Sequence, residues 1–211
     1  MSDEERAEIF ERFKKDRPEP TTELVYEGGY QLLVAVILSA QATDKSVNNV
    51  TANLFKVAPS PHSMVAMGKE KLSEFIRTVG LYRNKASNII RASEKLIKDH
   101  GGDVPSSYDE LVALPGVGRK TAQVVLNTLF NHPVIAVDTH VFRVSNRTGI
   151  ASSKNVADMD KKINKAVPIK YKKYAHHWLI LHGRYTCRSQ KPLCGRCIIM
   201  DLCEYQNKNL D

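Results

Sequence analysis

The sequence has no long hydrophobic run, and this bears on where the protein works. Its longest apolar stretch, residues 32–38, is far too short to cross a membrane. The amino-terminal segment is acidic and lacks the pattern of a signal or transit peptide. The chain of 211 residues also has no repeat or low-complexity tract, and its hydrophobic content of 42% is enough for globular packing. We therefore expect a soluble, intracellular, cytoplasmic protein with no membrane partner.

Acidic residues are missing from one part of the chain. Residues 161–196 contain ten Lys or Arg and no Asp or Glu, whereas acidic residues outnumber basic ones nine to five in residues 3–27. The net charge is +8 and the isoelectric point is about 9.3. A one-sided basic surface is typical of proteins that bind polyanions, with an affinity that falls as salt rises. A surface selected only for solubility would not explain the segregation.

Strand patterns are almost absent, and apolar residues recur at helical spacing instead, so the predicted fold class is all-α. The one strand-like run, residues 134–137, has no partner and is predicted to be an extended buried connector. Asp44 and Asp138 are predicted to cap helices. The expected helices cover residues 4–15, 30–41, 44–56, 63–67, 69–79, a longer one from about 83, 107–114, one after 118, 141–148, 155–167 and 172–186.

The most informative stretch is residues 114–122, which reads as a helix, a tight turn and a second helix. Gly116 and Gly118 permit positive φ and close approach of a ligand, and the start of the second helix offers free N–H groups to an anion such as a phosphate. Lys120 lies in that first turn beside Arg119, where the helix dipole opposes its charge. Together with partial burial, these surroundings favour the neutral amine, the form that attacks carbon. Ordinary helix punctuation and a phosphate-binding lysine are the alternative readings.

Cysteine is absent until residue 187, and then four occur together. They follow the spacing Cys187-x6-Cys194-x2-Cys197-x5-Cys203. Two disulfides are possible, but clustered cysteines in a reducing compartment more often bind metal. Four thiolates suit either zinc or an iron–sulfur cluster, and the spacing alone does not decide between them. Arg184, Arg188, Lys191 and Arg196 surround this loop, so we expect the metal-bound loop to hold cations against a DNA backbone, with a redox role as the alternative.

Residues 114–122 resemble the helix-hairpin-helix motif of the endonuclease III family of DNA glycosylases, in the version that keeps a lysine at position 120. The resemblance extends over nearly the whole chain, including residues 38–44, 79–82 and 137–141 and the four cysteines. It implies one [4Fe–4S] cluster bound by Cys187, Cys194, Cys197 and Cys203. It also implies a bifunctional DNA glycosylase and abasic-site lyase of base excision repair, acting as a monomer at the nucleoid on damaged double-stranded DNA.

The resemblance implies specific chemistry for two residues. Lys120 would attack the anomeric carbon of an oxidised pyrimidine nucleotide, expel the base and form a Schiff base, after which elimination of the 3′ phosphate nicks the strand. Asp138 would be the carboxylate that stabilises positive charge on the sugar or assists proton transfer. Its alternative role is a simple helix cap, and both roles are compatible. His140 is given only a supporting place beside Asp138.

The family likeness also predicts the DNA contacts. A glycosylase must extrude its target nucleotide and fill the gap that is left. Gln41 and Leu81 match the family's plug and wedge positions, although a capping amide and a partly buried loop leucine are the simpler readings. The other predicted contacts are Gly116, Val117, Gly118, Arg119, Thr121, Arg184, Arg188 and Lys191.

The implied layout has two helical domains on either side of a cleft. A six-helix domain would cover residues 22–132, with the hairpin at about 107–130, and a cluster domain would combine residues 1–21 with 133–211, including the loop at 187–203. Two other functions are considered. A non-catalytic DNA-binding module with structural zinc would make Lys120 incidental. A glycosylase that removes a base without nicking is disfavoured, because relatives of that type usually lack this lysine.

Overall fold

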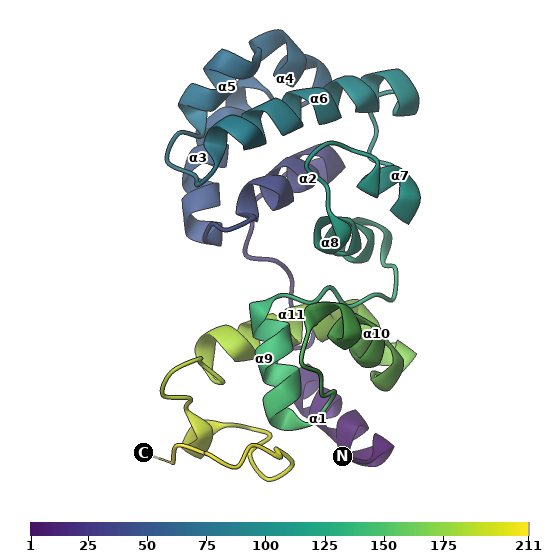
Figure 1. Ribbon diagram of the computed structural model, residues 1–211, viewed down its shortest axis with the longest axis vertical. Coiled ribbons are helices and arrows are strands. Elements are labelled where there is room, and N and C mark those ends of the chain that lie inside the picture. The colour runs from purple at the N-terminus through teal and green to yellow at the C-terminus, as the bar shows by residue number, and fades with distance from the viewer. Residues whose placement is uncertain (211) are drawn as a thin grey trace. The chain divides into compact units, whose positions relative to one another are not determined.

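The computed structural model describes residues 1–210 and is all-helical, as predicted (Figure 1). Within those residues there is no strand, and no helix is long and apolar enough to span a bilayer. The helices are α1 (Asp3–Asp16), α2 (Gly28–Ser39), α3 (Asp44–Val57), α4 (Pro61–Met67), α5 (Lys69–Phe75), α6 (Tyr82–His100), α7 (Tyr108–Val112), α8 (Arg119–Phe130), α9 (Thr139–Thr148), α10 (Val156–Ala166), α11 (Ile169–Tyr185) and the short 3-10 helix η1 (Cys194–Arg196).

The chain forms two compact units. One is Thr22–Phe130, and the other joins Met1–Thr21 to the chain from Asn131 onward. The first unit contains α2 to α8. Helices α4 and α5, both expected from the sequence, are separated only by Gly68, whose φ is +79°.

Helix α2 is the centre of the first unit. Every residue from Gln31 to Leu38 is buried, so the helix is covered on all sides by its neighbours. Burial of this kind removes most of each apolar side chain from water and supplies the main stabilising term. Tyr30 ties α2 to α6 through a 2.6 Å hydrogen bond between its hydroxyl and the Ser93 Oγ. The helix ends at Ser39, two residues before the predicted end at residue 41.

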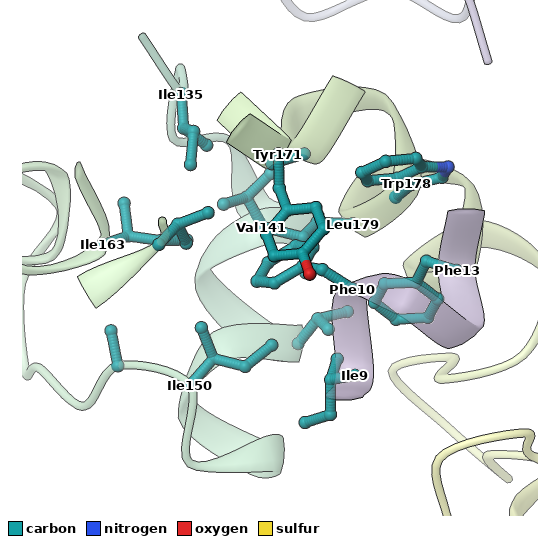
Figure 2. Close-up of a cluster of buried hydrophobic side chains, with 14 of the residues drawn as sticks. Ile9, Phe10, Phe13, Ile135, Val141, Ile150, Ile163, Tyr171, Trp178 and Leu179 are labelled. Carbon is teal, nitrogen blue, oxygen red and sulfur yellow. The ribbon is translucent and has the colours of Figure 1, made fainter. Parts of the chain in front are cut away.

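The second unit has a core built from both ends of the chain (Figure 2). Phe10 of α1 stacks on Tyr171 of α11 with ring centroids 5.5 Å apart, and it lies 6.2 Å from the Trp178 ring. The Trp178 indole N–H donates to the carbonyl of Arg17 at 2.7 Å, which satisfies its one polar group. The amino-terminal helix is therefore an integral part of this unit.

The segment between α8 and α9 is an extended connector, as predicted. Ile135, Ala136 and Val137 are buried, and side chains satisfy their backbone in place of a strand partner. The Ile135 N–H donates to Asn164 Oδ1 at 2.8 Å, and Asn164 Nδ2 donates to the Ile135 carbonyl at 3.0 Å. His176 lies 2.9 Å from the Ala136 carbonyl through its Nδ1. The run thus has a fixed path into α9.

One predicted helix cap was wrong. The cap of α3 is Thr43, whose hydroxyl accepts from the Ser46 N–H at 3.2 Å, and Asp44 is the first helical residue. Asp44 still suits that position, because a carboxylate in the first turn interacts favourably with the helix dipole. The second predicted cap, Asp138, is confirmed at the start of α9.

Candidate functional site

The turn between α7 and α8 has the predicted helix-hairpin-helix arrangement. Gly116 has a φ of +81°, and a Cβ built on it would lie 2.9 Å from the Cβ of Asn88 on α6. Both its backbone and its contact with α6 therefore require glycine. Gly118 differs, because its φ is not positive, so of the two properties that glycine permits only the close approach of a ligand applies there. A Cβ on Gly118 would meet nothing within 4 Å, which leaves its backbone open to a ligand.

The start of α8 supplies backbone donors. The first intrahelical bond of α8 runs from the Ala122 N–H to the Gly118 carbonyl at 3.0 Å, so the N–H groups before Ala122 have no acceptor inside the helix. An anion is the natural partner at such a helix start. The Val117 N–H, in contrast, already donates to the Leu114 carbonyl at 3.1 Å, and its side chain is buried. Val117 therefore shapes the turn from inside the fold.

Lys120 lies in the first turn of α8 with an exposed side chain. The partial burial expected from the sequence was wrong. The side chain has no hydrogen bond or ion pair to any of residues 1–210. No carboxylate of the described residues 1–210 pairs with it. The amine is free to meet a ligand that approaches the hairpin.

Gln41 and Leu81 share an unusual backbone conformation. Their φ angles are +56° and +60°, in the left-handed region that residues other than glycine seldom adopt. Both side chains are exposed, and Leu81 shows 58% of its surface to solvent. The prediction that Gln41 ends α2 was wrong, because the helix ends at Ser39 and Gln41 lies in the turn that follows. Gly80 lies against this turn, because a Cβ built on it would be 3.7 Å from the Gln41 carbonyl oxygen.

Asp138 is the amino-terminal cap of α9. Its Oδ1 accepts a hydrogen bond from the Val141 N–H at 2.7 Å. Its neighbour His140 lies 3.2 Å from an Arg143 guanidinium nitrogen through Nδ1. Burial lowers the pKa of His140, and the Asp138 carboxylate offsets part of this effect. Asp138 is therefore a partly buried carboxylate that a helix start holds in a fixed orientation.

The four cysteines lie together in the loop that follows α11, and none forms a disulfide. Burial raises the pKa of Cys197 to about 11, and the other three thiols add to this increase. Four thiols within electrostatic range of one another are a donor set suited to a cationic metal group, which would favour the thiolates. Among residues 1–210, no three His, Cys, Asp or Glu side chains are grouped to bind a single metal ion. A multinuclear iron–sulfur cluster fits this donor set.

Cations hold the backbone of this loop. Arg143 donates to the carbonyls of Cys187 and Gly183 at 3.0 and 2.8 Å. Arg147 donates to the carbonyls of Arg188 and Ser189 at 2.6 and 2.9 Å, and one of its nitrogens lies 3.7 Å from the Cys187 Sγ. These guanidinium groups also offset the negative charge that four thiolates would carry.

The predicted DNA-contact cations of this region differ in exposure. Arg188 and Lys191 are exposed, and Lys191 has a φ of +46°. Arg184 is half-buried on the last turn of α11 and has partners within the fold. The exposed cations Arg188 and Lys191 are therefore better placed to meet a phosphate backbone than Arg184 is.

Three residues that shape these sites were missed from the sequence. Arg143 and Arg147 occur four residues apart on α9, and this spacing places both on one helix face toward the cysteine loop. The third is Lys85, a lysine with only 5% of its surface exposed. It occupies a position at helical spacing from Ile89 and Ala92, where the apolar pattern of α6 gives no reason to expect a charge.

Comparison with known proteins agrees with this arrangement. The pattern of the HhH-GPD superfamily base excision DNA repair proteins matches residues 34–168, and the iron-sulfur binding domain of endonuclease III matches residues 187–203. The endonuclease III proteins of Haemophilus influenzae and Escherichia coli K12 are each 54% identical over 208 residues, covering 99% of this chain and 99% of theirs.

The fold also matches a solved structure of a trapped endonuclease III–DNA covalent intermediate. The TM-score is 0.89 at 43% sequence identity, and the match covers 96% of each chain. A family match over most of the chain and relatives at this identity over its full length lead to one conclusion. The chain belongs to the endonuclease III family of HhH-GPD base excision DNA repair proteins.

Proposed function

We propose that this protein is a bifunctional DNA glycosylase and abasic-site lyase that uses Lys120 as its nucleophile. The observation that carries the proposal is the position of Lys120, which is an exposed amine without a partner in the first turn of a helix whose start can bind phosphate. The similar protein described as a covalent intermediate with DNA supports a mechanism in which enzyme and DNA become linked. The alternative of a non-catalytic DNA-binding module is not favoured by this family membership.

The proposed reaction begins when the neutral Lys120 amine attacks the anomeric carbon of an extruded nucleotide. The carbon–nitrogen bond to the damaged base breaks as the bond to Lys120 forms, and the base leaves with the bonding electrons and takes up a proton. Ring opening then gives a Schiff base between Lys120 and the sugar. Loss of a proton from the neighbouring sugar carbon expels the 3′ phosphate, which nicks the strand.

Asp138 would act on the same sugar as Lys120. A carboxylate stabilises positive charge that develops as the base leaves, and it can accept the proton that the amine must lose. The hydrogen bond from the Val141 N–H occupies Oδ1, so this cap fixes the carboxylate while leaving Oδ2 for chemistry. We assign the cap and the chemistry to the two oxygens of one side chain.

The remaining predicted contacts would bind and deform the DNA. Gly118, Arg119 and Thr121 would meet a phosphate at the start of α8, and the exposed Arg188 and Lys191 would meet another part of the backbone. Leu81 would wedge between bases, and Gln41 would fill the space that the extruded nucleotide leaves. The family implies oxidised pyrimidines as the bases removed.

The cysteine loop would hold a [4Fe–4S] cluster through Cys187, Cys194, Cys197 and Cys203. Such a cluster supplies a rigid cross-link in a loop that is too small to form its own core. Arg143 and Arg147 of α9 also donate hydrogen bonds to the backbone of the loop and so help to fix its conformation. We assign the loop a positioning role for its exposed cations.

Borohydride trapping tests the nucleophile. The protein is incubated with duplex DNA that contains one thymine glycol or one abasic site, and borohydride reduces any Schiff base to a stable amine. We expect a covalent protein–DNA band from the wild-type chain and none from Lys120→Ala, while Lys165→Ala, a change at another basic position, keeps the band. A folded wild-type chain without a band, or an equal band from Lys120→Ala, would contradict the proposal.

A further inference from the structure

Lys85 is a buried cation that closes the end of another helix. Its ammonium donates to the Leu38 carbonyl at 2.9 Å and to the Ala40 carbonyl at 2.5 Å, at the carboxyl end of α2. These are carbonyls that a helix leaves without intrahelical partners, and a cation suits the negative end of the helix dipole. No carboxylate among residues 1–210 pairs with Lys85. These two carbonyls are therefore the hydrogen-bond acceptors of the Lys85 ammonium.

The same residue also joins the two turns that carry the predicted plug and wedge. Through its side chain, Lys85 holds Ala40, the residue directly before Gln41. The Lys85 N–H donates to the Leu81 carbonyl at 3.0 Å in the first turn of α6, a helical bond that any side chain here would allow, so the side chain itself acts on the Ala40 carbonyl. Gly80 lies beside the Gln41 turn, because a Cβ built on it would be 3.7 Å from the Gln41 carbonyl oxygen. All of these residues belong to the unit Thr22–Phe130.

The buried lysine at this position has a cost as well as a structural role. Burial lowers the pKa of Lys85, because removing the ammonium from water disfavours the charged form. An apolar side chain of similar length would avoid that cost but would leave the Leu38 and Ala40 carbonyls without this donor. Gln41 and Leu81, moreover, both have positive φ, a conformation that persists only where the surroundings hold it. The buried ammonium supplies such a constraint on the Gln41 side.

We propose that Lys85 is a positioning residue that fixes the Gln41 and Leu81 turns relative to each other, so that both side chains enter a duplex as one preformed unit. This inference rests on the proposed function, because it concerns how a base is extruded. Lys85 does not touch the reacting sugar in this scheme. We expect Lys85 to have little effect on a substrate in which no base has to be displaced from a stack.

That limit gives a test with two substrates. Single-turnover rates are measured for Lys85→Met on duplex DNA with one thymine glycol and on a single-stranded oligonucleotide with one abasic site. We expect the duplex rate to fall roughly tenfold to a hundredfold, since misplacing a positioning group by about 1 Å can cost that much. The single-stranded rate should stay within about twofold of the wild-type rate, because it needs no plug.

Lys95→Met is the matched control. Lys95 is also on α6, but it is partly exposed, and its ammonium pairs with Asp99 at 2.6 Å. This variant should keep both rates. A double-mutant cycle with Gln41→Ala then asks whether Lys85 acts through the plug. We expect Lys85→Met to cost little once Gln41 is already removed, since effects on one shared contact are not additive.

Several results would overturn the inference. They are a wild-type duplex rate in Lys85→Met, an equal loss on both substrates, and a loss that multiplies fully with that of Gln41→Ala. If Lys85→Met does not fold, Lys85→Gln, which keeps one amide donor, is measured in the same way and judged by the same substrate difference. A wild-type chain that forms no borohydride adduct contradicts the proposed function instead, so the two failures can be told apart.

Discussion

Gly116 of the hairpin turn packs directly against Asn88 of α6. A Cβ on Gly116 would lie 2.9 Å from the Asn88 Cβ, nearer than such carbons approach in folded proteins. Helix α6 therefore contacts the hairpin turn at Asn88, and one turn earlier it holds the carboxyl end of α2 through Lys85. The hairpin turn and the turn that carries the predicted plug therefore both contact α6.

The two hairpin glycines should respond differently to alanine. Gly116→Ala should lower the free energy of unfolding by about 2 kcal/mol, because it adds a Cβ at positive φ and against Asn88. Gly118→Ala should cost less than about 1 kcal/mol but weaken binding to abasic duplex DNA, since its Cβ would enter the space left for a phosphate. Urea denaturation and fluorescence anisotropy measure the two effects. Equal stability losses would contradict this account of the turn.

Substitutions at Asp138 should separate its cap from its chemistry. Asparagine caps helices as well as aspartate, so Asp138→Asn should keep the unfolding free energy within about 0.5 kcal/mol. Single-turnover base release should nevertheless fall by about 100-fold or more, because the amide cannot accept a proton or balance charge. Full activity in Asp138→Asn would show that the residue is only a cap.

Asn155 provides the matched control for that experiment. It caps α10 through a 2.9 Å hydrogen bond from the Asp158 N–H to its Oδ1, in the same unit as Asp138. Asn155→Ala should lose about 1 kcal/mol of stability, as Asp138→Ala should, but keep its activity at temperatures where it is folded. A parallel loss of activity in both alanine variants would attribute the effect to stability.

The buried His177 should make stability depend on pH. Burial and the neighbouring His176 lower the pKa of His177 to about 3 in the folded chain, whereas the unfolded value is about 6.5. Below pH 6.5 the unfolded chain binds a proton that the folded chain does not, so stability falls as pH falls toward 3. The slope from this group is about 1.4 kcal/mol per pH unit at most.

Replacing His177 measures this contribution. His177→Leu should flatten the pH dependence of the unfolding free energy between pH 6.5 and about 4.5. Denaturant titrations across that range give the slopes. An unchanged slope in His177→Leu would show that this imidazole is not the neutral buried group described.

Loss of the metal group should loosen the carboxyl-terminal loop. Purified protein should be brown and contain iron, and Cys197→Ser should lose both properties because one of four thiolate ligands is gone. Limited proteolysis should then cut within residues 187–203, since the loop has no core of its own. Ser189→Ala, in the same loop, should keep the iron. Zinc in place of iron would contradict the cluster assignment.

Much of this architecture could be predicted from the sequence because local rules determine it. Helical periodicity gave the helices to within a few residues, and the turn before residue 119 followed from glycine and proline chemistry. The connector at residues 134–137 was predicted because an isolated strand cannot satisfy its backbone, and Asn164 and His176 fill that role. The cofactor and the activity were predicted from the family resemblance.

The features that could not be predicted depend on contacts between distant residues. Lys85 looks like a surface lysine until α2 is placed against it, 45 residues earlier in the chain. That a Cβ has no room on Gly116 but is free on Gly118 depends on the position of Asn88 on another helix. The cap of α3 depended on a choice between adjacent residues, Thr43 and Asp44, and local propensity allows both.

The account depends most directly on which atom of the protein bonds to the DNA sugar. After borohydride reduction with abasic duplex DNA, the adduct is digested with protease and nuclease, and mass spectrometry locates the sugar remnant. We predict the remnant on Lys120 Nζ in the peptide that begins the helix after the hairpin. A remnant on another lysine or on the amino terminus, with Lys120 unmodified, would contradict the account.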